Sequence, residues 1–158
     1  AAAVRRPPHR GRLIELFAVD PARDAVLDAL RFRAVRRHRD LARAVDGDGS
    51  TRWTTGKFQT PGQWFQIDLP TATEVAGIVL DSARSGNDYP RGYSLEISND
   101  GKSWEPLKKG KGDSSITEIL FKKPVKTNHI RITQTGEVMG KFWSIHEVDL
   151  IAPAAEAQ

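Results

Sequence analysis

The chain has 158 residues, of which 39% are hydrophobic and 28% charged, a balance typical of one globular domain rather than a disordered or fibrous chain. It contains no cysteine, which excludes disulfide scaffolds, thiolate zinc sites and cysteine nucleophiles. No apolar run approaches the roughly 20 residues of a membrane-spanning helix, and the arginine-rich start lacks the apolar centre of a signal peptide, so any secretory signal is expected outside this chain.

Charge divides the chain into two parts. Residues 1–45 carry eleven arginines, no lysine and five acidic residues, a net charge of +6, whereas residues 46–158 have a net charge of −2. The basic balance therefore belongs to the N-terminal part, where only Phe17 and Phe32 are available for base stacking. We expect no nucleic-acid binding by the folded body.

The first expected element is a helix from about Pro21 to Ala42. Asp20 suits the N-cap, Pro21 suits the first helical position, and apolar residues then recur at helical spacing. Ala1 to Arg12 have the composition of a flexible arm. Residues 1–40 are thus predicted to be a basic, arginine-rich extension, helix-leaning or disordered. The abrupt change from arginine to lysine after it also suggests a different coding origin, such as a frameshift, which the mass of the native protein would test.

From Val45 onward, short β-prone segments are separated by Gly, Pro, Asn and Asp, a pattern typical of all-β domains. Trp64–Leu69 and Tyr93–Ser98 alternate between apolar and polar residues, and Val75–Leu80 is mostly apolar. Asn99-Asp100-Gly101 suits a tight turn. Further strands are expected at 104–108, 116–121, 129–134 and 145–151. These segments predict an antiparallel β-sandwich jelly roll over residues 41–151, followed by an Ala-rich tail at 152–158, with Trp53, Trp64 and Trp104 in its core.

The segment Asp46-Gly47-Asp48-Gly49-Ser50-Thr51 carries alternating oxygen side chains that can surround a hard cation such as calcium. It is not an EF-hand loop, because Thr51 and Lys57 stand where that loop needs Gly and Glu. A cation would need further oxygens, and Glu147 is the best-placed source if the first and last strands are neighbours. An empty Asx-rich turn is the alternative.

The segment 84–91 gathers several kinds of polar group between two strands. Planar polar groups of this sort read sugar hydroxyls, next to an aromatic face that stacks on the sugar ring. The structural alternative is that Asn87 or Asp88 caps the turn, that Tyr89 and Arg91 close one end of the sandwich, and that Trp143 belongs to the core. The candidate ligand-binding residues are Arg84, Asn87, Asp88, Tyr89 and Arg91, with Phe142 and Trp143 as a candidate aromatic platform.

Catalytic patterns are absent from the sequence. His-Glu-x-x-His, Gly-x-Ser-x-Gly and phosphate-binding glycine signatures do not occur, and no spacing singles out a carboxylate pair. Gly110-Lys111-Gly112 is interpreted as a hairpin tip between strands. The chain is therefore predicted not to be an enzyme.

Five motifs, taken in order, resemble the discoidin domain, which is the coagulation factor V/VIII C-type module, over about residues 41–151. Because the chain lacks the cysteine pair usual in animal discoidin domains, it is more similar to the bacterial galactose-binding-like branch of carbohydrate-binding modules. The motifs are Asp46-Gly47-Asp48 with Thr51-Arg52-Trp53, Gln63 to Leu69, Ser98-Asn99-Asp100-Gly101-x-x-Trp104, Ile130-Arg131-Ile132-Thr133, and Trp143-Ser144-Ile145-His146-Glu147-Val148.

The resemblance implies a jelly roll that binds ligands with loops at one end and does no catalysis. It also implies a structural calcium ion, held by the side chains of Asp46, Asp48, Thr51 and Glu147 and by backbone carbonyls from around Arg43 and His146.

The resulting prediction is a noncatalytic carbohydrate-binding module, a monomeric part of a larger secreted, cell-surface or periplasmic bacterial protein. The first alternative is an adhesion module that binds a membrane surface or a protein partner through apolar loop tips, and the second is a structural spacer. The expected tips at Asn87-Asp88, Asn99-Asp100-Gly101 and Lys111-Gly112-Asp113 are polar, which favours sugar over lipid.

Overall fold

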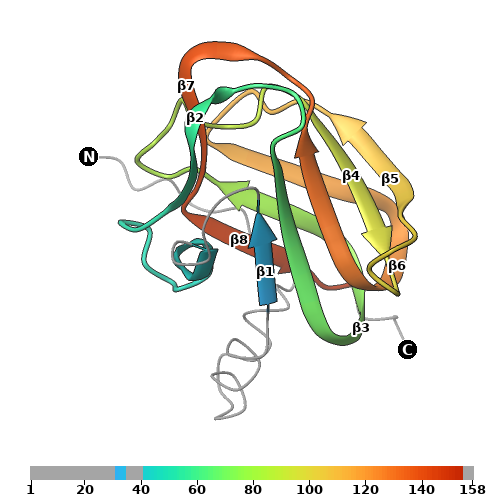
Figure 1. The fold of residues 1–158 in the computed structure, drawn as a ribbon. Coiled ribbons are helices and arrows are strands. Elements are labelled where there is room, and N and C mark those ends of the chain that lie inside the picture. Colours follow the sequence, from blue (N-terminus) through green and yellow to red (C-terminus); the bar gives the residue numbers. More distant parts are fainter. Residues whose placement is uncertain (1–30, 35–40, 155–158) are drawn as a thin grey trace.

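The computed structural model describes residues 31–34 and 41–154, and these form two antiparallel sheets packed as a sandwich (Figure 1). The larger sheet has the order β1-β3-β6-β4-β5, with β8 also paired to β3, and the smaller sheet consists of β2 and β7. The prediction of an antiparallel β-sandwich is confirmed. The elements are β1 (Arg31–Ala34), a 3-10 helix η1 (Leu41–Ala44), β2 (Trp53–Gln59), β3 (Trp64–Asp81), β4 (Tyr93–Ser98), β5 (Glu105–Gly110), β6 (Ile116–Gln134), β7 (Val138–Ile145) and β8 (Glu147–Ile151).

Two pairs of predicted strands are each one long strand in the structure. The segments predicted at 64–69 and 75–80 both lie on β3, and those at 116–121 and 129–134 both lie on β6. The two strands pair along their length, with Phe65 opposite Ile132 and Ile67 opposite Ile130. Register shifts between Asp68 and Thr73 interrupt this ladder, which is why the sequence pattern breaks there. Phe65 and Ile67 are buried as predicted, but Gln66 and Asp68, predicted on the polar face, are also buried, with 3% and 7% exposure. They hydrogen-bond Arg131 and His129 of the neighbouring strand β6.

The smaller sheet was not predicted in full. Its strands pair from Trp53 opposite Ile145 to Gln59 opposite Val138, with register shifts around Phe58. Gly56 and Gly140 adopt positive φ angles of 60° and 78°, and such residues interrupt an alternating pattern. A strand with bulges therefore leaves little period-two signal in the sequence.

The predicted helix from Pro21 to Ala42 is wrong where the structure describes it. Arg31–Ala34 is the strand β1, which pairs antiparallel with residues 65–68 of β3, and Leu41–Ala44 is a 3-10 helix. Unpaired backbone groups along β3 gain partners from β1, and this long-range pairing outweighs a weak local helical pattern. Residues 1–30, 35–40 and 155–158, including the predicted arm and the end of the tail, lie outside the described residues.

The three tryptophans assigned to the core have two different environments. Trp53 is 1% exposed and contacts Phe65 edge-on, with ring centroids 5.0 Å apart. Trp64 and Trp104 are only half-buried and flank the guanidinium of Arg131, which lies 5.1 and 3.9 Å from their ring centroids. The core assignment is thus confirmed for Trp53 and wrong for the other two, which form a cation–π clamp on the outer face.

The expected turn after β4 is present. The Asp100 carboxylate accepts hydrogen bonds from the backbone N–H of Ser103 and Lys102, and these bonds lower the pKa of Asp100 to about 2.

Gly110-Lys111-Gly112 is not a hairpin tip, because β5 pairs with β4 and not with β6. Within the described ranges, no helix is long and apolar enough to cross a membrane.

Candidate functional site

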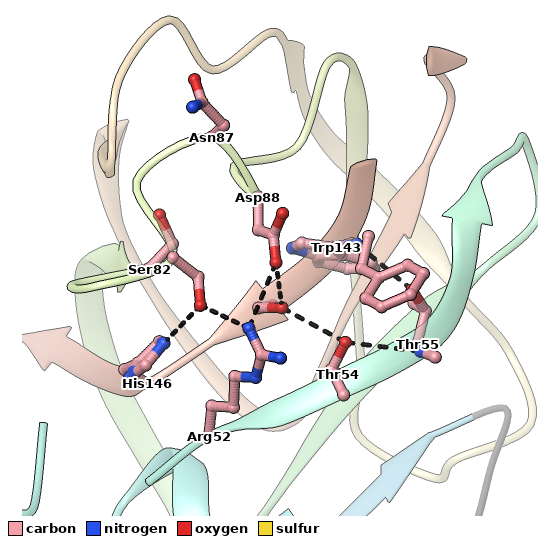
Figure 2. Close-up of polar contacts among 12 residues, drawn as sticks. Arg52, Thr54, Thr55, Ser82, Asn87, Asp88, Trp143 and His146 are labelled. Atoms are coloured by element: carbon pink, nitrogen blue, oxygen red, sulfur yellow. Dashed lines mark hydrogen bonds and ion pairs between the residues drawn. The ribbon is translucent and has the colours of Figure 1, made fainter. Parts of the chain in front are cut away.

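The polar segment 84–91 is fixed against the smaller sheet by Asp88. Its carboxylate accepts a hydrogen bond of 2.7 Å from Ser144 Oγ on β7 and lies 3.4 Å from the guanidinium of Arg52 (Figure 2). Its backbone carbonyl accepts a further bond from the Ser144 N–H. The Asp88 side chain is only 14% exposed. This geometry matches the structural alternative, in which Asp88 anchors the loop instead of facing a ligand.

A second set of bonds joins this loop to the acidic loop at 46–51. The Oγ of Ser85 lies 3.0 Å from His146 Nε2 and accepts a bond from Arg52. The other ring nitrogen of His146 lies 2.9 Å from the carbonyl oxygen of Gly49. His146 is buried, with 3% exposure. The candidate ligand loop and the candidate metal loop are therefore held in one hydrogen-bonded unit.

The side chains of Tyr89 and Arg91 pack against each other at the end of the loop. The Arg91 guanidinium lies 3.7 Å from the centroid of the Tyr89 ring and donates hydrogen bonds to the carbonyls of Tyr89 and Asn87. Both side chains are half-buried. One face of the Tyr89 ring is covered by this contact, so Tyr89 does not offer that face for stacking.

Arg84 and Asn87 are the exposed side chains among the candidates. In Figure 2, Asn87 points away from the network around Asp88. Its amide can both donate and accept hydrogen bonds, and the Arg84 guanidinium can donate several. These two residues are free to meet a ligand from solvent.

The aromatic surface beside this loop differs from the expected one. Trp143 is 0% exposed, so its ring cannot stack on a ligand. Phe142 instead stacks on Phe58, with ring centroids 6.1 Å apart, and Phe58 is 48% exposed. Phe142 and Ser144 are two residues apart on β7 and so lie on one face, the face that Asp88 contacts. Phe58 was missed because the irregular pairing of β2 leaves no period-two signal in its residues.

The acidic loop brings three oxygen atoms together around the hydroxyl group of Thr51. Its hydroxyl oxygen lies 2.5 Å from Asp46 Oδ2, 3.1 Å from the Asp48 carbonyl oxygen and 3.4 Å from the Arg43 carbonyl oxygen. The Asp48 carboxylate turns away to accept a bond from the Ser50 N–H, and hydrogen bonds from Ser50 lower the pKa of Asp48. In this structure the Asp48 carbonyl lies at the cluster and its carboxylate is bonded to Ser50, and the side-chain role that the resemblance implied stays a prediction.

Glu147 lies beside this cluster with an unsatisfied atom. Its Oε1 is buried and has no hydrogen-bond partner among residues 31–34 and 41–154. Burial is the largest cause that raises the pKa of Glu147 to about 7, and the negative charges of nearby Asp46, Asp149 and Asp81 add to it. A hydrogen bond from the backbone N–H of Gly47 lowers the pKa in part. A divalent cation would supply the missing partner and reverse this repulsion, so the residues present fit calcium.

The candidate calcium site does not consist of carboxylates alone. Among residues 31–34 and 41–154, no group of three or more His, Cys, Asp or Glu side chains is placed to hold a metal ion. Calcium also accepts carbonyl and hydroxyl oxygens, which the loop provides. Because both ring nitrogens of His146 are engaged, only its backbone carbonyl is available for the expected role.

Two hollows in the described part of the chain lie away from the segment 84–91. A cleft of about 270 Å³ is lined by Trp53, Thr55, Lys57 and the turn 60–63, and a groove of about 420 Å³ runs along β4 and β5. Neither is lined by a residue of the segment 84–91.

Asp88→Ala should lower the free energy of unfolding by about 1–3 kcal/mol, because the buried Ser144 hydroxyl loses its carboxylate partner. Asn87→Ala, at an exposed neighbour, should change it by less than about 0.5 kcal/mol. Urea denaturation measures both, and equal effects of the two substitutions would contradict the anchoring role of Asp88.

Comparison with known proteins agrees with this architecture. Among curated proteins, the chain is 31% identical over 93 residues to neuropilin-1 from Gallus gallus and 32% identical over 91 residues to retinoschisin from Takifugu rubripes. Each match spans 51% of this chain, but only 10% of neuropilin-1 and 32% of retinoschisin.

Two solved structures with the same fold come from Clostridium perfringens. The family 32 carbohydrate-binding module of Clostridium perfringens NanJ, in complex with galactose, has a TM-score of 0.67 and 23% identity, covering 79% of this chain and 95% of that one. A Clostridium perfringens family 32 module in complex with GalNAc-β-1,3-galactose has a TM-score of 0.67 and 21% identity, covering 80% and 98%. These likenesses confirm the jelly-roll fold.

The model of the F5/8 type C domain matches residues 35–148, most of the chain and all of the motifs that resemble it. The match includes the acidic loop, the segment 84–91, and the strands from β2 to β7. This chain therefore belongs to the F5/8 type C (discoidin) domain family.

Proposed function

We propose that this domain is a noncatalytic carbohydrate-binding module that holds a larger secreted or cell-surface bacterial protein on a glycan. One observation carries the proposal: the anchored loop 84–91 lies on the same face of the smaller sheet as the stacked pair Phe58–Phe142. Polar groups beside an accessible aromatic surface suit the hydroxyls and the apolar ring face of a sugar.

The neighbours with this fold support a carbohydrate ligand, with galactose as the first candidate. Two of them are family 32 carbohydrate-binding modules in complex with galactose and with GalNAc-β-1,3-galactose, and a third, from AlyQ, is in complex with 4,5-unsaturated mannuronic acid. In this chain, Asn87 and Arg84 would bind hydroxyls, Phe142 with Phe58 would stack on the ring, and Tyr89 and Arg91 would border the site. Asp88 would hold the loop from behind.

The proposal includes a structural calcium ion at the acidic loop. Asp46, Thr51 and Glu147 would bind it by side chains, and Arg43, Asp48 and His146 by carbonyls. The ion would neutralise the carboxylates around Glu147 and stabilise the loop that His146 links to the ligand loop. An extracellular, cell-surface or periplasmic location fits both a glycan ligand and a calcium ion.

A glycan array followed by calorimetric titration tests the sugar site. Asn87→Ala, Arg84→Ala and Phe142→Ala should each weaken binding by about 1–3 kcal/mol while the fold survives. Asn99→Ala is the matched control, because Asn99 is an exposed asparagine in the turn at the far end of β4. Unchanged affinity in all three variants would place the ligand elsewhere.

The dependence of affinity on salt concentration distinguishes a sugar ligand from a polyanion. A sugar held by hydrogen bonds and stacking releases no counterions, so its affinity should change by less than about twofold between low and physiological salt. Binding to nucleic acid through the basic extension would weaken steeply over the same range. Titration in both buffers measures the slope, and a steep loss would contradict the sugar site.

A second candidate is attachment to a membrane surface, and the structure offers one observation for it. Phe58 is 48% exposed and Met139 82% exposed on the smaller sheet, next to Lys57 and Lys141. The sequence analysis identified only polar loop tips and did not find this apolar tip. Sedimentation with phosphatidylserine vesicles tests it, and Met139→Asp should abolish any binding that depends on the tip.

A further inference from the structure

Two buried glutamines lie between the ligand loop and the aromatic pair. Gln59 on β2 and Gln134 on β6 are both 0% exposed. The Gln59 amide nitrogen donates to the carbonyls of Tyr89 and Phe142, at 2.9 and 2.8 Å. One NH₂ group thus bridges the loop and the strand that carries the aromatic surface.

The side-chain amide oxygens of the two glutamines accept hydrogen bonds from backbone N–H groups at the end of the loop and beside it. Gln59 Oε1 accepts bonds from the Arg91 N–H at 3.1 Å and from Gln134 Nε2 at 2.7 Å. Gln134 Oε1 accepts bonds from the N–H of Gly92 and Gly136, at 3.1 and 3.2 Å. Gln59 thus uses both N–H donors and accepts two bonds, and in the loop it pairs the carbonyl of Tyr89 and the N–H of Arg91.

Glycines let these segments approach closely. A Cβ on Gly136 would lie 2.5 Å from the Gly92 nitrogen, and a Cβ on Gly92 would lie 2.7 Å from Thr135 Oγ1. The Thr135 N–H also donates to the Gly92 carbonyl. The backbone around residue 92 therefore has little room to shift while the two glutamines are in place.

We infer that Gln59 and Gln134 are positioning residues, which set the spacing between the ligand loop and the Phe58–Phe142 pair. The inference rests on the proposed function, because it concerns a ligand that contacts the loop and the rings at once. Removing either amide leaves buried carbonyl and N–H groups unpaired, and the loop would move to reach water. Affinity would then fall although neither glutamine touches the ligand.

The test compares Gln59→Met and Gln134→Met with Gln66→Met. Gln66 is the matched control, since it is 3% exposed and bonds Asp68 and Arg131 on the other face of the larger sheet. Galactose is titrated at a temperature where every variant is folded. The first two substitutions should weaken binding by about tenfold, and the control should stay within about twofold.

Amide hydrogen exchange gives a readout that needs no ligand. The N–H groups of Arg91, Gly92 and Gly136 should be protected in the unmodified chain and should exchange at least about tenfold faster when their glutamine is replaced. Gln66→Met should leave them unchanged. The unmodified chain can be measured even if a variant does not fold.

Two results would overturn the inference. One is exchange of the Arg91 and Gly92 amides as fast as that of the exposed Asn87 in the unmodified chain. The other is that Gln59→Met and Gln134→Met melt at lower temperature than the unmodified chain but bind galactose with unchanged affinity, which marks a purely structural role. Protected amides in a chain that does not bind galactose would count against the proposed ligand and not against the positioning of the loop.

Discussion

Trp143→Ala should lower the free energy of unfolding by about 3–5 kcal/mol, the range for removing a buried aromatic side chain from a core. Trp143 is 0% exposed and contacts Trp53 edge-on, with ring centroids 5.3 Å apart and an interplanar angle of 88°. The substitution would leave a cavity between the sheets. Urea denaturation measures the loss, and a domain of this size has little stability to spare.

Phe142→Ala is the matched control, because it removes an aromatic ring from the adjacent residue on the opposite face of β7. Phe142 is half-buried, so its loss should cost less stability than the loss of Trp143 but should weaken glycan binding. The opposite result, weak binding in a stable Trp143→Phe variant, would return Trp143 to the ligand site and contradict its place in the core.

Removing calcium should have the second-largest effect. Binding to the folded state alone stabilises it by about 3 kcal/mol at a hundred times the dissociation constant, so a chelator should lower the melting temperature by several degrees. Glu147→Gln should melt at the same temperature with calcium and with chelator, because the buried carboxylate is lost. Asp113→Asn, at an exposed acid outside the loop, should keep the calcium response. Identical melting curves of the unmodified chain would remove the metal site.

The metal-free domain should also respond to pH through Glu147. Burial raises the pKa of Glu147 from 4.5 to about 7, so the folded state binds its proton more tightly than the unfolded state. Stability should therefore fall as pH rises from about 4.5 to about 7 and level off above that range. Glu147→Gln should flatten this slope in melting experiments with chelator. A slope that survives the substitution would assign the effect to another group.

The amino-acid sequence by itself determined the fold class and the acidic loop. Alternation in Trp64–Leu69 and Tyr93–Ser98 reports strands, because side chains of a strand point to opposite faces in turn, although the structure buries both faces of the first segment. The loop 46–51 and Glu147 were named from residue types alone, and the structure brings them together. Short-range patterns suffice where the determining physics is local.

The tertiary structure alone decided what faces solvent and what pairs with what. Residues 31–34 have a helical pattern but form a strand, because the edge of β3 offers backbone partners from far along the chain. Trp143 and Phe142 are adjacent in sequence, yet only the packing of β2 across β7 shows which ring is buried. Asp88 has the chemistry of a ligand-binding residue, but Ser144 and Arg52, 56 and 36 residues away, engage it first. Each outcome depends on long-range contacts, which local periodicity cannot specify.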